Sequence, residues 1–257
     1  MMIRVRKKKR LVVGMATAAL MVVTVSGSVN AALQQGGGGR NVVVGADDDN
    51  AANERVQPAG VQAKQHLDNT DLLSGGAKDD LLVGRLGDDV LDGGAGVDIL
   101  VGGPEAGTAP NPNSDVILGG AHKDINIWAP GDGSDAFAGG QGRDVQILAP
   151  FVLENGDLAL ERFRGRTIPR VTIGELPQFT CTIESARGAV RGFDHLVRFF
   201  ANDNLAVTIR LRDVETVLCP SENPDSVQRA RLDRGSTEFV EVPADRFKSV
   251  VGAIIGN

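Results

Sequence analysis

Aspartate recurs at a nine-residue interval through one stretch of this chain, and this regularity limits the possible folds more than any other feature. The first four aspartates of the series lie nine residues apart: Asp71, Asp80, Asp89 and Asp98. A glycine-containing turn precedes each of the last three, and a short apolar run such as Leu81–Val83 follows. Self-similarity at a fixed period is typical of a repeat architecture, so short structural units of one kind are expected to stack.

The series continues with less regular spacing. Its later members are Asp115, Asp124, Asp135 and Asp144. The gap before Asp115 is 17 residues, and the gaps after it are nine, eleven and nine residues. We interpret the long gap as one repeat that carries an eight-residue loop around residues 104–111. Alternatively, Ala106 and Gly107 mark a further repeat that has lost its aspartate.

Three consecutive units, residues 75–83, 84–92 and 93–101, follow the nonapeptide pattern GGxGxDxUx, where U is apolar, with Lys78 and Arg85 each at one glycine position of the first two units. Residues 139–144 match its first six positions again, whereas residues 119–124 lack the later glycine. Over roughly residues 66–149 the chain therefore resembles the RTX, or hemolysin-type, calcium-binding family. The resemblance implies a parallel β-roll in which Ca²⁺ ions bind between stacked turns.

The resemblance also assigns metal-site residues. The aspartates at the sixth position of the repeats are Asp71, Asp80, Asp89, Asp98, Asp115, Asp124, Asp135 and Asp144. The glycines of the turns are Gly75, Gly76, Gly84, Gly87, Gly93, Gly94, Gly96, Gly119, Gly120, Gly139, Gly140 and Gly142. In the family, two nonapeptides complete one turn of the coil. This arrangement pairs Asp71 with Asp89, Asp80 with Asp98, Asp115 with Asp135 and Asp124 with Asp144, while Asp89/Asp115 and Asp98/Asp124 span the irregular gap.

Calcium chemistry explains why such residues recur. Ca²⁺ takes roughly 6 to 8 oxygen ligands, so carboxylates and backbone carbonyls must converge. Glycine allows the positive φ that aims carbonyls inward. The alternative is an ordinary β-solenoid, because aspartate is common in turns for local hydrogen-bonding reasons. Three further aspartates, Asp79, Asp88 and Asp92, lie off the family position and are expected to be solvated.

The eighth position of each repeat is expected to point into the coil, because side chains alternate faces along a strand. It is occupied by Leu73, Leu82, Leu91, Leu100, Ile117, Asn126, Phe137 and Gln146. The polar pair Asn126 and Gln146 would stack on one sheet. An apolar stripe would then face outward beside this pair: Ile125, Ile127, Val145 and Ile147. A bare apolar stripe usually marks a contact surface, so we expect the C-terminal region to dock there with Trp128 nearby. The alternative is a register slip of one residue.

Residues 1–31 have the layout of a secretory signal peptide, with a basic head at residues 4–10 and an apolar stretch at residues 11–25. An uncleaved membrane anchor is the alternative. Cleavage would leave 21 basic and 33 acidic residues, a formal net charge of −12. This charge favours cations over nucleic acid or anionic membranes. Residues 32–65, with four consecutive glycines at 36–39, are expected to form a flexible linker.

The pattern changes after residue 150. Residues 205–211 alternate between apolar and polar side chains, as a half-buried strand does. Shorter strands are predicted at 158–163, 170–173, 179–183, 196–200, 214–219 and 239–242, and a short helix near 247–255. Cys181 and Cys219 are expected to form a disulfide in an exported chain. The predicted fold class is therefore all-β: a calcium-binding parallel β-roll over residues 66–149, then a small antiparallel β-domain over residues 150–257.

Enzyme motifs are absent from the sequence. It contains neither the H-E-x-x-H zinc motif nor the G-x-S-x-G nucleophile turn, so no catalytic residue is assigned. The expected function is a secreted calcium-binding protein with a structural or interaction role at the cell surface or outside the cell. Its expected partners besides calcium are an extracellular protein or polysaccharide, with no nucleic acid and no membrane span in the mature chain. The alternative is an exported hydrolase-like enzyme with an unrecognised site in the C-terminal region.

Overall fold

The computed structural model describes residues 32–35, 42–44, 71–85, 87–103, 114–154, 157–174, 176–186 and 190–243, and the positions 251 and 254. Residues 1–31, predicted as a signal peptide, and the loop around residues 104–111 lie outside these ranges. Almost all regular structure in the described part of the chain is β-strand, as the sequence predicts.

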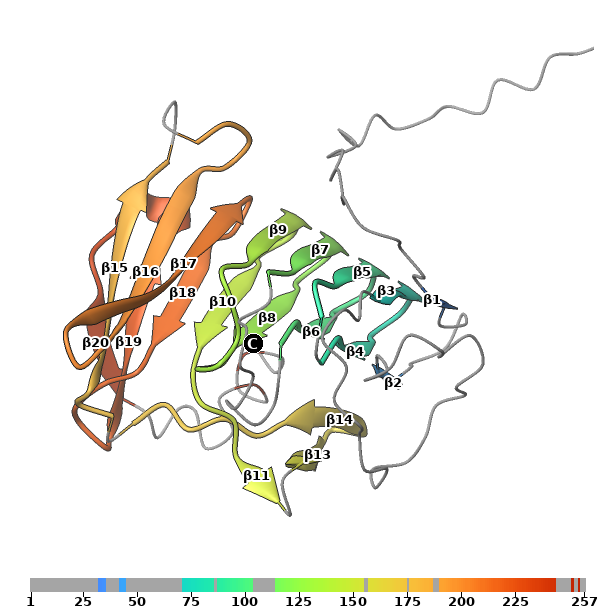
Figure 1. Ribbon diagram of the computed structural model, residues 1–257, viewed down its shortest axis with the longest axis horizontal. Helices are drawn as coiled ribbons and strands as arrows, with labels where there is room; N and C mark the ends of the chain where they lie inside the picture. The colour runs from blue at the N-terminus through green and yellow to red at the C-terminus, as the bar shows by residue number, and fades with distance from the viewer. Residues whose placement is uncertain are drawn as a thin grey trace, which may run out of the picture.

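Two eight-stranded sheets form the body of the protein (Figure 1). The first contains, in spatial order, β1 (Ala32–Gln35), β3 (Asp71–Ala77), β5 (Val90–Ala95), β7 (Val116–Ala121), β9 (Ala136–Gln141), β17 (Asn204–Arg212), β16 (His195–Ala201) and β15 (Phe179–Ser185). The second contains β2 (Val42–Val44), β4 (Leu81–Val83), β6 (Ile99–Val101), β8 (Ile125–Trp128), β10 (Val145–Leu148), β18 (Thr216–Cys219), β19 (Ser226–Arg231) and β20 (Val240–Pro243). Between β10 and β15 lie the short pairs β11 (Leu153–Glu154) with β12 (Asp157–Leu158) and β13 (Leu160–Phe163) with β14 (Arg166–Pro169), and the 3₁₀ turn η1 (Leu232–Arg234) follows β19.

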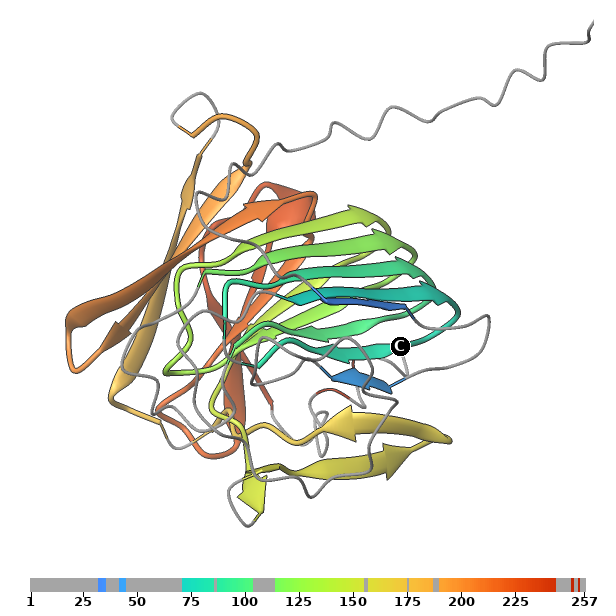
Figure 2. The same cartoon turned by 45° about the vertical axis from the view of Figure 1, so that its right-hand side comes forward.

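The repeats alternate between the two sheets, so equivalent positions two repeats apart lie side by side in parallel strands (Figure 2). Leu73 pairs with Leu91 in the first sheet, and Leu82 pairs with Leu100 in the second. This arrangement is the predicted parallel β-roll. The 17-residue gap does not disturb it, because β5 pairs with β7 in the same register. The gap is therefore one repeat with an insertion, and the alternative of an additional degenerate repeat is wrong.

The interior of the roll consists of the eighth-position side chains. All eight have 0% exposure, including Asn126 and Gln146. The Nδ2 group of Asn126 donates to Oε1 of Gln146 over 2.9 Å, so the two polar residues satisfy part of each other's hydrogen bonding. Asn126 also pairs with Gln146 in the parallel register of β8 and β10. The alternative of a one-residue slip is therefore wrong.

The outer face of the second sheet is apolar and covered. Ile125, Ile127, Val145 and Ile147 are buried in a second apolar cluster with Leu81, Val83, Ile99, Val101, Ala149, Ile168, Ile173, Leu218, Val227, Val251 and Ile254. The predicted docking is therefore confirmed. The segment that contains β13 and β14 supplies Ile168 and Ile173, and positions 251 and 254 supply two more side chains. The expected position of Trp128 beside this stripe is wrong, because its side chain points to the opposite face of the sheet. It packs on Phe199 in the inner cluster, with ring centroids 4.8 Å apart.

The C-terminal strands continue both sheets of the roll. β17 pairs parallel to β9 and β18 pairs parallel to β10, after which β16, β15, β19 and β20 add in antiparallel order. One inner apolar cluster runs from Leu73 to Leu232. The predicted disulfide between Cys181 and Cys219 joins β15 of the first sheet to β18 of the second. The roll and the C-terminal strands thus share their sheets and their interior.

Some predicted elements differ from the structure. The second strand of the β13–β14 hairpin lies at Arg166–Pro169 rather than 170–173. β19 was not predicted, because its sequence SVQRAR contains few apolar residues. Two segments of the predicted linker form strands instead. β1 pairs with β3 and β2 pairs with β4, which supplies partners for the backbone groups at this edge of the roll.

Among the described residues, no helix is long and apolar enough to span a membrane.

Candidate metal centre

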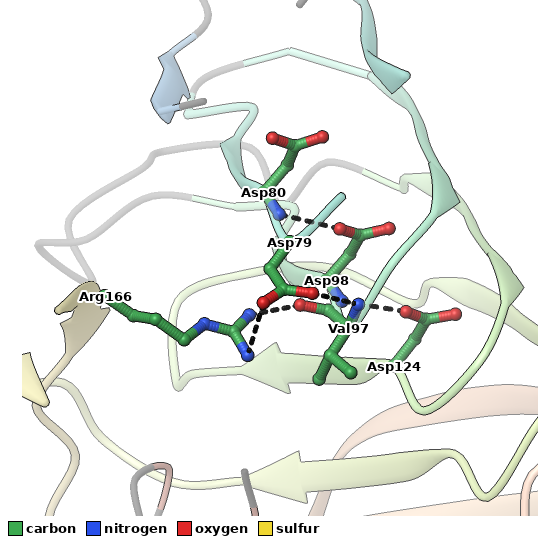
Figure 3. A network of polar contacts seen from close by, with 6 residues as sticks. All are labelled: Asp79, Asp80, Val97, Asp98, Asp124 and Arg166. Atoms are coloured by element: carbon green, nitrogen blue, oxygen red, sulfur yellow. Dashed lines mark hydrogen bonds and ion pairs between the residues drawn. The ribbon is translucent and has the colours of Figure 1, made fainter. Parts of the chain in front are cut away.

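The repeat aspartates form two columns, one at each type of turn between the sheets. The first column contains Asp71, Asp89, Asp115 and Asp135, and the second contains Asp80, Asp98, Asp124 and Asp144. Within each column, the backbone N–H of one aspartate donates to Oδ1 of the aspartate one coil further on. Figure 3 shows this arrangement for Asp80, Asp98 and Asp124.

The hydrogen-bonded pairs are those expected from the repeat. The distances from N to Oδ1 are 2.7 Å for Asp71–Asp89 and for Asp80–Asp98, 2.9 Å for Asp115–Asp135 and 2.8 Å for Asp124–Asp144. The pairs across the insertion are equally close, at 2.7 Å for Asp89–Asp115 and 2.9 Å for Asp98–Asp124. The columns therefore continue past the insertion.

The second carboxylate oxygen of these aspartates is buried. Among the described residues, Oδ2 lacks a hydrogen-bond partner in Asp89, Asp98, Asp115, Asp124, Asp135 and Asp144. An unsatisfied buried carboxylate oxygen is costly, because it has lost water and gained no donor. Such atoms therefore indicate a ligand that supplies positive charge.

The turn glycines make room for these oxygens. A Cβ on Gly93 would lie 2.6 Å from Oδ2 of Asp98 and 2.7 Å from the carbonyl oxygen of Gly119. Carboxylate and carbonyl oxygens therefore converge on the bare face of this glycine. The equivalent positions in other turns are Gly75, Gly84, Gly119 and Gly139.

The remaining predicted glycines have positive φ or lie at close contacts between coils. Gly94 has a φ of 94°, and a Cβ there would collide with the carbonyl of Gly76 one coil earlier. The other predicted glycines with positive φ are Gly76, Gly87, Gly96, Gly120 and Gly140. A Cβ on Gly142 would collide with the carbonyl of His122.

Burial dominates the electrostatics of both columns. It raises the pKa of Asp98 and of Asp144 to about 7 and the pKa of Asp124 to about 8, although a backbone hydrogen bond lowers each value in part. Neighbouring carboxylates of the column contribute to the raised pKa of Asp98 and Asp124, and Glu215 and Asp213 contribute to that of Asp144. In the first column, burial also raises the pKa of Asp89, Asp115 and Asp135 well above the usual range. Without a cation, these groups therefore resist ionisation.

These features fit calcium. The columns offer buried carboxylate oxygens that have no donor, carbonyl oxygens beside them and excess negative charge, which are the ligands and charge that a hard divalent cation requires. The paired aspartates would hold the ion, which on binding supplies the positive charge that the coil lacks.

Asp79 is not solvated as predicted. Its Oδ1 accepts a hydrogen bond of 3.0 Å from the backbone N–H of Val97, and its Oδ2 lies 3.5 Å from Nη1 of Arg166 (Figure 3). Nη2 of Arg166 donates to the carbonyl oxygen of Val97. This guanidinium, from the β13–β14 hairpin, therefore bridges two coils of the roll. Asp88 is exposed as predicted, and its Oδ1 accepts a hydrogen bond of 2.9 Å from the N–H of Ser114.

Two further carboxylates lie at the columns, and the repeat pattern predicts neither of them. Oε2 of Glu215, which precedes β18, accepts from the N–H of Asp144 over 2.6 Å and so takes the next place in the second column. Asp132 lies beside the first column, where one oxygen from each of Asp115, Asp132 and Asp135 falls within 4.8 Å of the others. Neither residue follows a glycine turn at the nine-residue spacing, so the repeat pattern carried no signal for them.

Comparison with known proteins supports the same assignment for part of this region. Comparisons with curated proteins and with solved structures each found no match. A family model does match residues 68–106, in four copies, and its description is the RTX calcium-binding nonapeptide repeat. The stacked aspartates and the turn glycines of this segment therefore belong to RTX calcium-binding repeats.

Proposed function

We propose that this chain is a secreted calcium-binding protein whose β-roll folds when Ca²⁺ binds. Its role at the cell surface or outside the cell would be structural or interaction-based and not catalytic. The observation that carries this proposal is the pair of buried aspartate columns with second carboxylate oxygens that lack donors. The RTX repeats supply the identity of the metal.

Coupling between metal and folding follows from the charges. Without calcium, each column stacks carboxylates at one edge of the sheets, and ionising them costs desolvation and mutual repulsion. A cation that binds only the folded coil stabilises it by RT ln(1 + [L]/Kd), about 1.4 kcal/mol for each site at about ten times Kd. Extracellular calcium sites can be weak, with Kd of roughly 10⁻⁴ to 10⁻³ M, because calcium is abundant there.

Several features support a location outside the cell. The basic head and apolar stretch of residues 1–31 have the layout of a signal peptide. The disulfide between Cys181 and Cys219 fits an oxidising compartment. If this proposal holds, N-terminal sequencing of protein recovered from the culture medium will begin near residue 32. Protein that retains residues 1–31 in the membrane fraction would contradict secretion.

A non-catalytic role is supported by the absence of recognisable hydrolase motifs from the sequence. An extracellular protein or polysaccharide is the proposed class of partner, because the acidic chain disfavours nucleic acid and anionic membranes.

Circular dichroism of the mature chain, residues 32–257, tests the metal coupling. We expect a strong β signal in millimolar Ca²⁺, its loss in excess EGTA and its return when calcium is restored. Mg²⁺ at the same concentration is the control, because it demands a smaller octahedral site and should not restore the signal. A β signal that is unchanged by chelation would refute folding on calcium, even if equilibrium dialysis still detected bound ions.

A further inference from the structure

The irregular eleven-residue spacing between Asp124 and Asp135 adds one acidic residue to the first column. Asp132 lies in the extra turn after β8, and it is 6% exposed although it occupies no repeat position. Its Oδ1 accepts a hydrogen bond of 2.8 Å from the N–H of Gly133. A Cβ on Gly103, two residues after β6, would collide with the Asp132 carboxylate, so a glycine at this position makes room for the side chain.

Three buried carboxylates converge at this point. Asp115 and Asp135 are each 1% exposed, and an oxygen from each lies within 4.8 Å of an oxygen of Asp132. A second observation is independent of this clustering: Oδ2 of Asp115 is buried and lacks any hydrogen-bond partner among the described residues. The side chains of Asp132 and Asp135 lie within hydrogen-bonding reach of each other. Backbone donors therefore do not account for all the oxygen atoms brought together here.

The local charge matches a divalent cation. Burial raises the pKa of Asp132 to about 7, and the charge of Asp132 raises the pKa of Asp115 and Asp135 further. The cation whose charge acts on Asp135 is Arg210, which donates from Nη2 to the carbonyl oxygen of Ser134 over 2.6 Å. Asp89, the preceding aspartate of the column, adds a further negative charge beside Asp115. Acidic groups therefore outnumber the single guanidinium here, and a divalent cation would offset the excess.

We infer that Asp132 adds a third carboxylate to the Asp115–Asp135 pair, so that these residues form a three-carboxylate calcium site where the other pairs of the columns offer two. This inference deepens the proposed calcium binding. Calcium affinity rises with the number of charged ligands. The site therefore binds more tightly than the pairs, and Asp132 is the residue that makes the difference. The opposing explanation is that the three groups share protons and bind no metal.

Trp128 provides a local reporter for this site. It is the only tryptophan, and the chain contains no tyrosine. Its Nε1 donates to the carbonyl oxygen of Gly133 over 2.9 Å, and Gly133 in turn donates to Asp132. Tb³⁺ binds the same oxygen ligands as Ca²⁺ and emits light when a nearby indole transfers excitation to it. Emission from Tb³⁺ on excitation of Trp128 therefore reports occupancy beside Gly133.

The experiment titrates Tb³⁺ into the mature protein and then competes it with Ca²⁺. The expected result is sensitised emission that Ca²⁺ displaces. D132N keeps the acceptor for Gly133 but removes one charged ligand, so its half-saturation should rise roughly tenfold or more, since even outer-shell changes commonly cost 10- to 100-fold. The matched control is D203N. It removes one charge from the exposed β16–β17 turn, outside the proposed site, and should leave the Tb³⁺ titration curve unchanged.

The outcomes separate this site from calcium binding as a whole. If D132N and the wild type have the same curve, Asp132 is not a ligand and the inference is overturned. If the wild type gives no sensitised emission while equilibrium dialysis still finds bound Ca²⁺, the site fails but the proposed function stands. If dialysis finds no Ca²⁺, both fail. Should D132N not fold, crystals of the wild type soaked in Tb³⁺ decide by an anomalous peak among the three carboxylates, whose absence overturns the inference.

Discussion

Replacing Asp98 with asparagine should make the fold more stable in the absence of calcium and reduce the number of calcium ions that it binds. Asp98 lies in the middle of the second column, is fully buried and accepts the N–H of Asp80 through Oδ1. Asparagine retains that oxygen but cannot ionise. In excess EGTA, Asp98→Asn should therefore be more stable than the wild type at pH 8, and in calcium it should bind fewer ions.

The magnitude follows from the pKa of Asp98, which burial raises from 3.8 to about 7. At about 1.36 kcal/mol for each pKa unit, ionising this carboxyl in the metal-free fold costs roughly 4 kcal/mol. Below about pH 3 the group is protonated in the folded and unfolded chain alike, so it costs nothing. Between pH 4 and pH 7 the unfolded chain ionises first, which lowers the stability of the wild type as pH rises. Above pH 8 the full cost applies.

Urea unfolding, monitored by circular dichroism, measures the free energy of unfolding of both proteins. In EGTA, the free energy of unfolding of Asp98→Asn should exceed that of the wild type by less than about 1 kcal/mol at pH 4 and by at most about 4 kcal/mol at pH 8. If the wild type is already unfolded in EGTA at pH 8, the variant should show the larger β signal without urea. In millimolar calcium at pH 8 the order should reverse or the gap should close.

Asp203→Asn is the matched control, because it makes the same chemical change in an exposed turn. Its φ of 62° is one that asparagine tolerates well. It should show no gain in EGTA at either pH. The reasoning is refuted if Asp98→Asn is less stable than the wild type in EGTA at pH 8, or if its calcium stoichiometry is unchanged.

Three further predictions concern what holds the roll together. Replacing Cys181 and Cys219 with serine opens a 38-residue loop and should lower the free energy of unfolding by about 4 kcal/mol, measured in urea with calcium present. Arg166→Gln removes the guanidinium that bridges two coils, and it should cost about 1 to 3 kcal/mol and speed protease cleavage of the β13–β14 hairpin. Asn126→Leu leaves Oε1 of Gln146 without its donor and should cost about 1 to 3 kcal/mol in the same assay, whereas adding Gln146→Leu should recover most of the loss.

Each of these changes has a control. Dithiothreitol should destabilise the wild type but not the serine double variant. Arg170→Gln breaks an exposed ion pair with Glu154 and should cost less than about 1 kcal/mol. An equal effect of Arg166→Gln and Arg170→Gln would contradict the bridging role, and an additive loss in the Asn126→Leu/Gln146→Leu variant would contradict the pairing of the two amides.

The sequence alone was sufficient for the columns and the interior of the roll. In a coil, each repeat stacks on another copy of itself, so a residue's neighbours follow from its position in the period. That is why the pairing of Asp80 with Asp98, the inward position of Leu91 and the outward position of Ile127 could be predicted. The same regularity carried the register across the insertion after residue 103.

Only the tertiary structure determines the contacts of residues that lie outside the nine-residue period. Asp132 and Glu215 reach the columns from outside the nonapeptide pattern, and Glu215 lies 71 residues from the Asp144 whose N–H it accepts. The sequence indicated that an apolar face needed a cover, but not that Ile168 and Ile254 would supply it. It also did not indicate that β17 and β18 would extend both sheets. A periodic sequence determines the contacts between neighbouring repeats. An exposed sheet edge or apolar face, in contrast, can accept any segment with suitable backbone or side chains. Only the path of the whole chain determines which segment packs there.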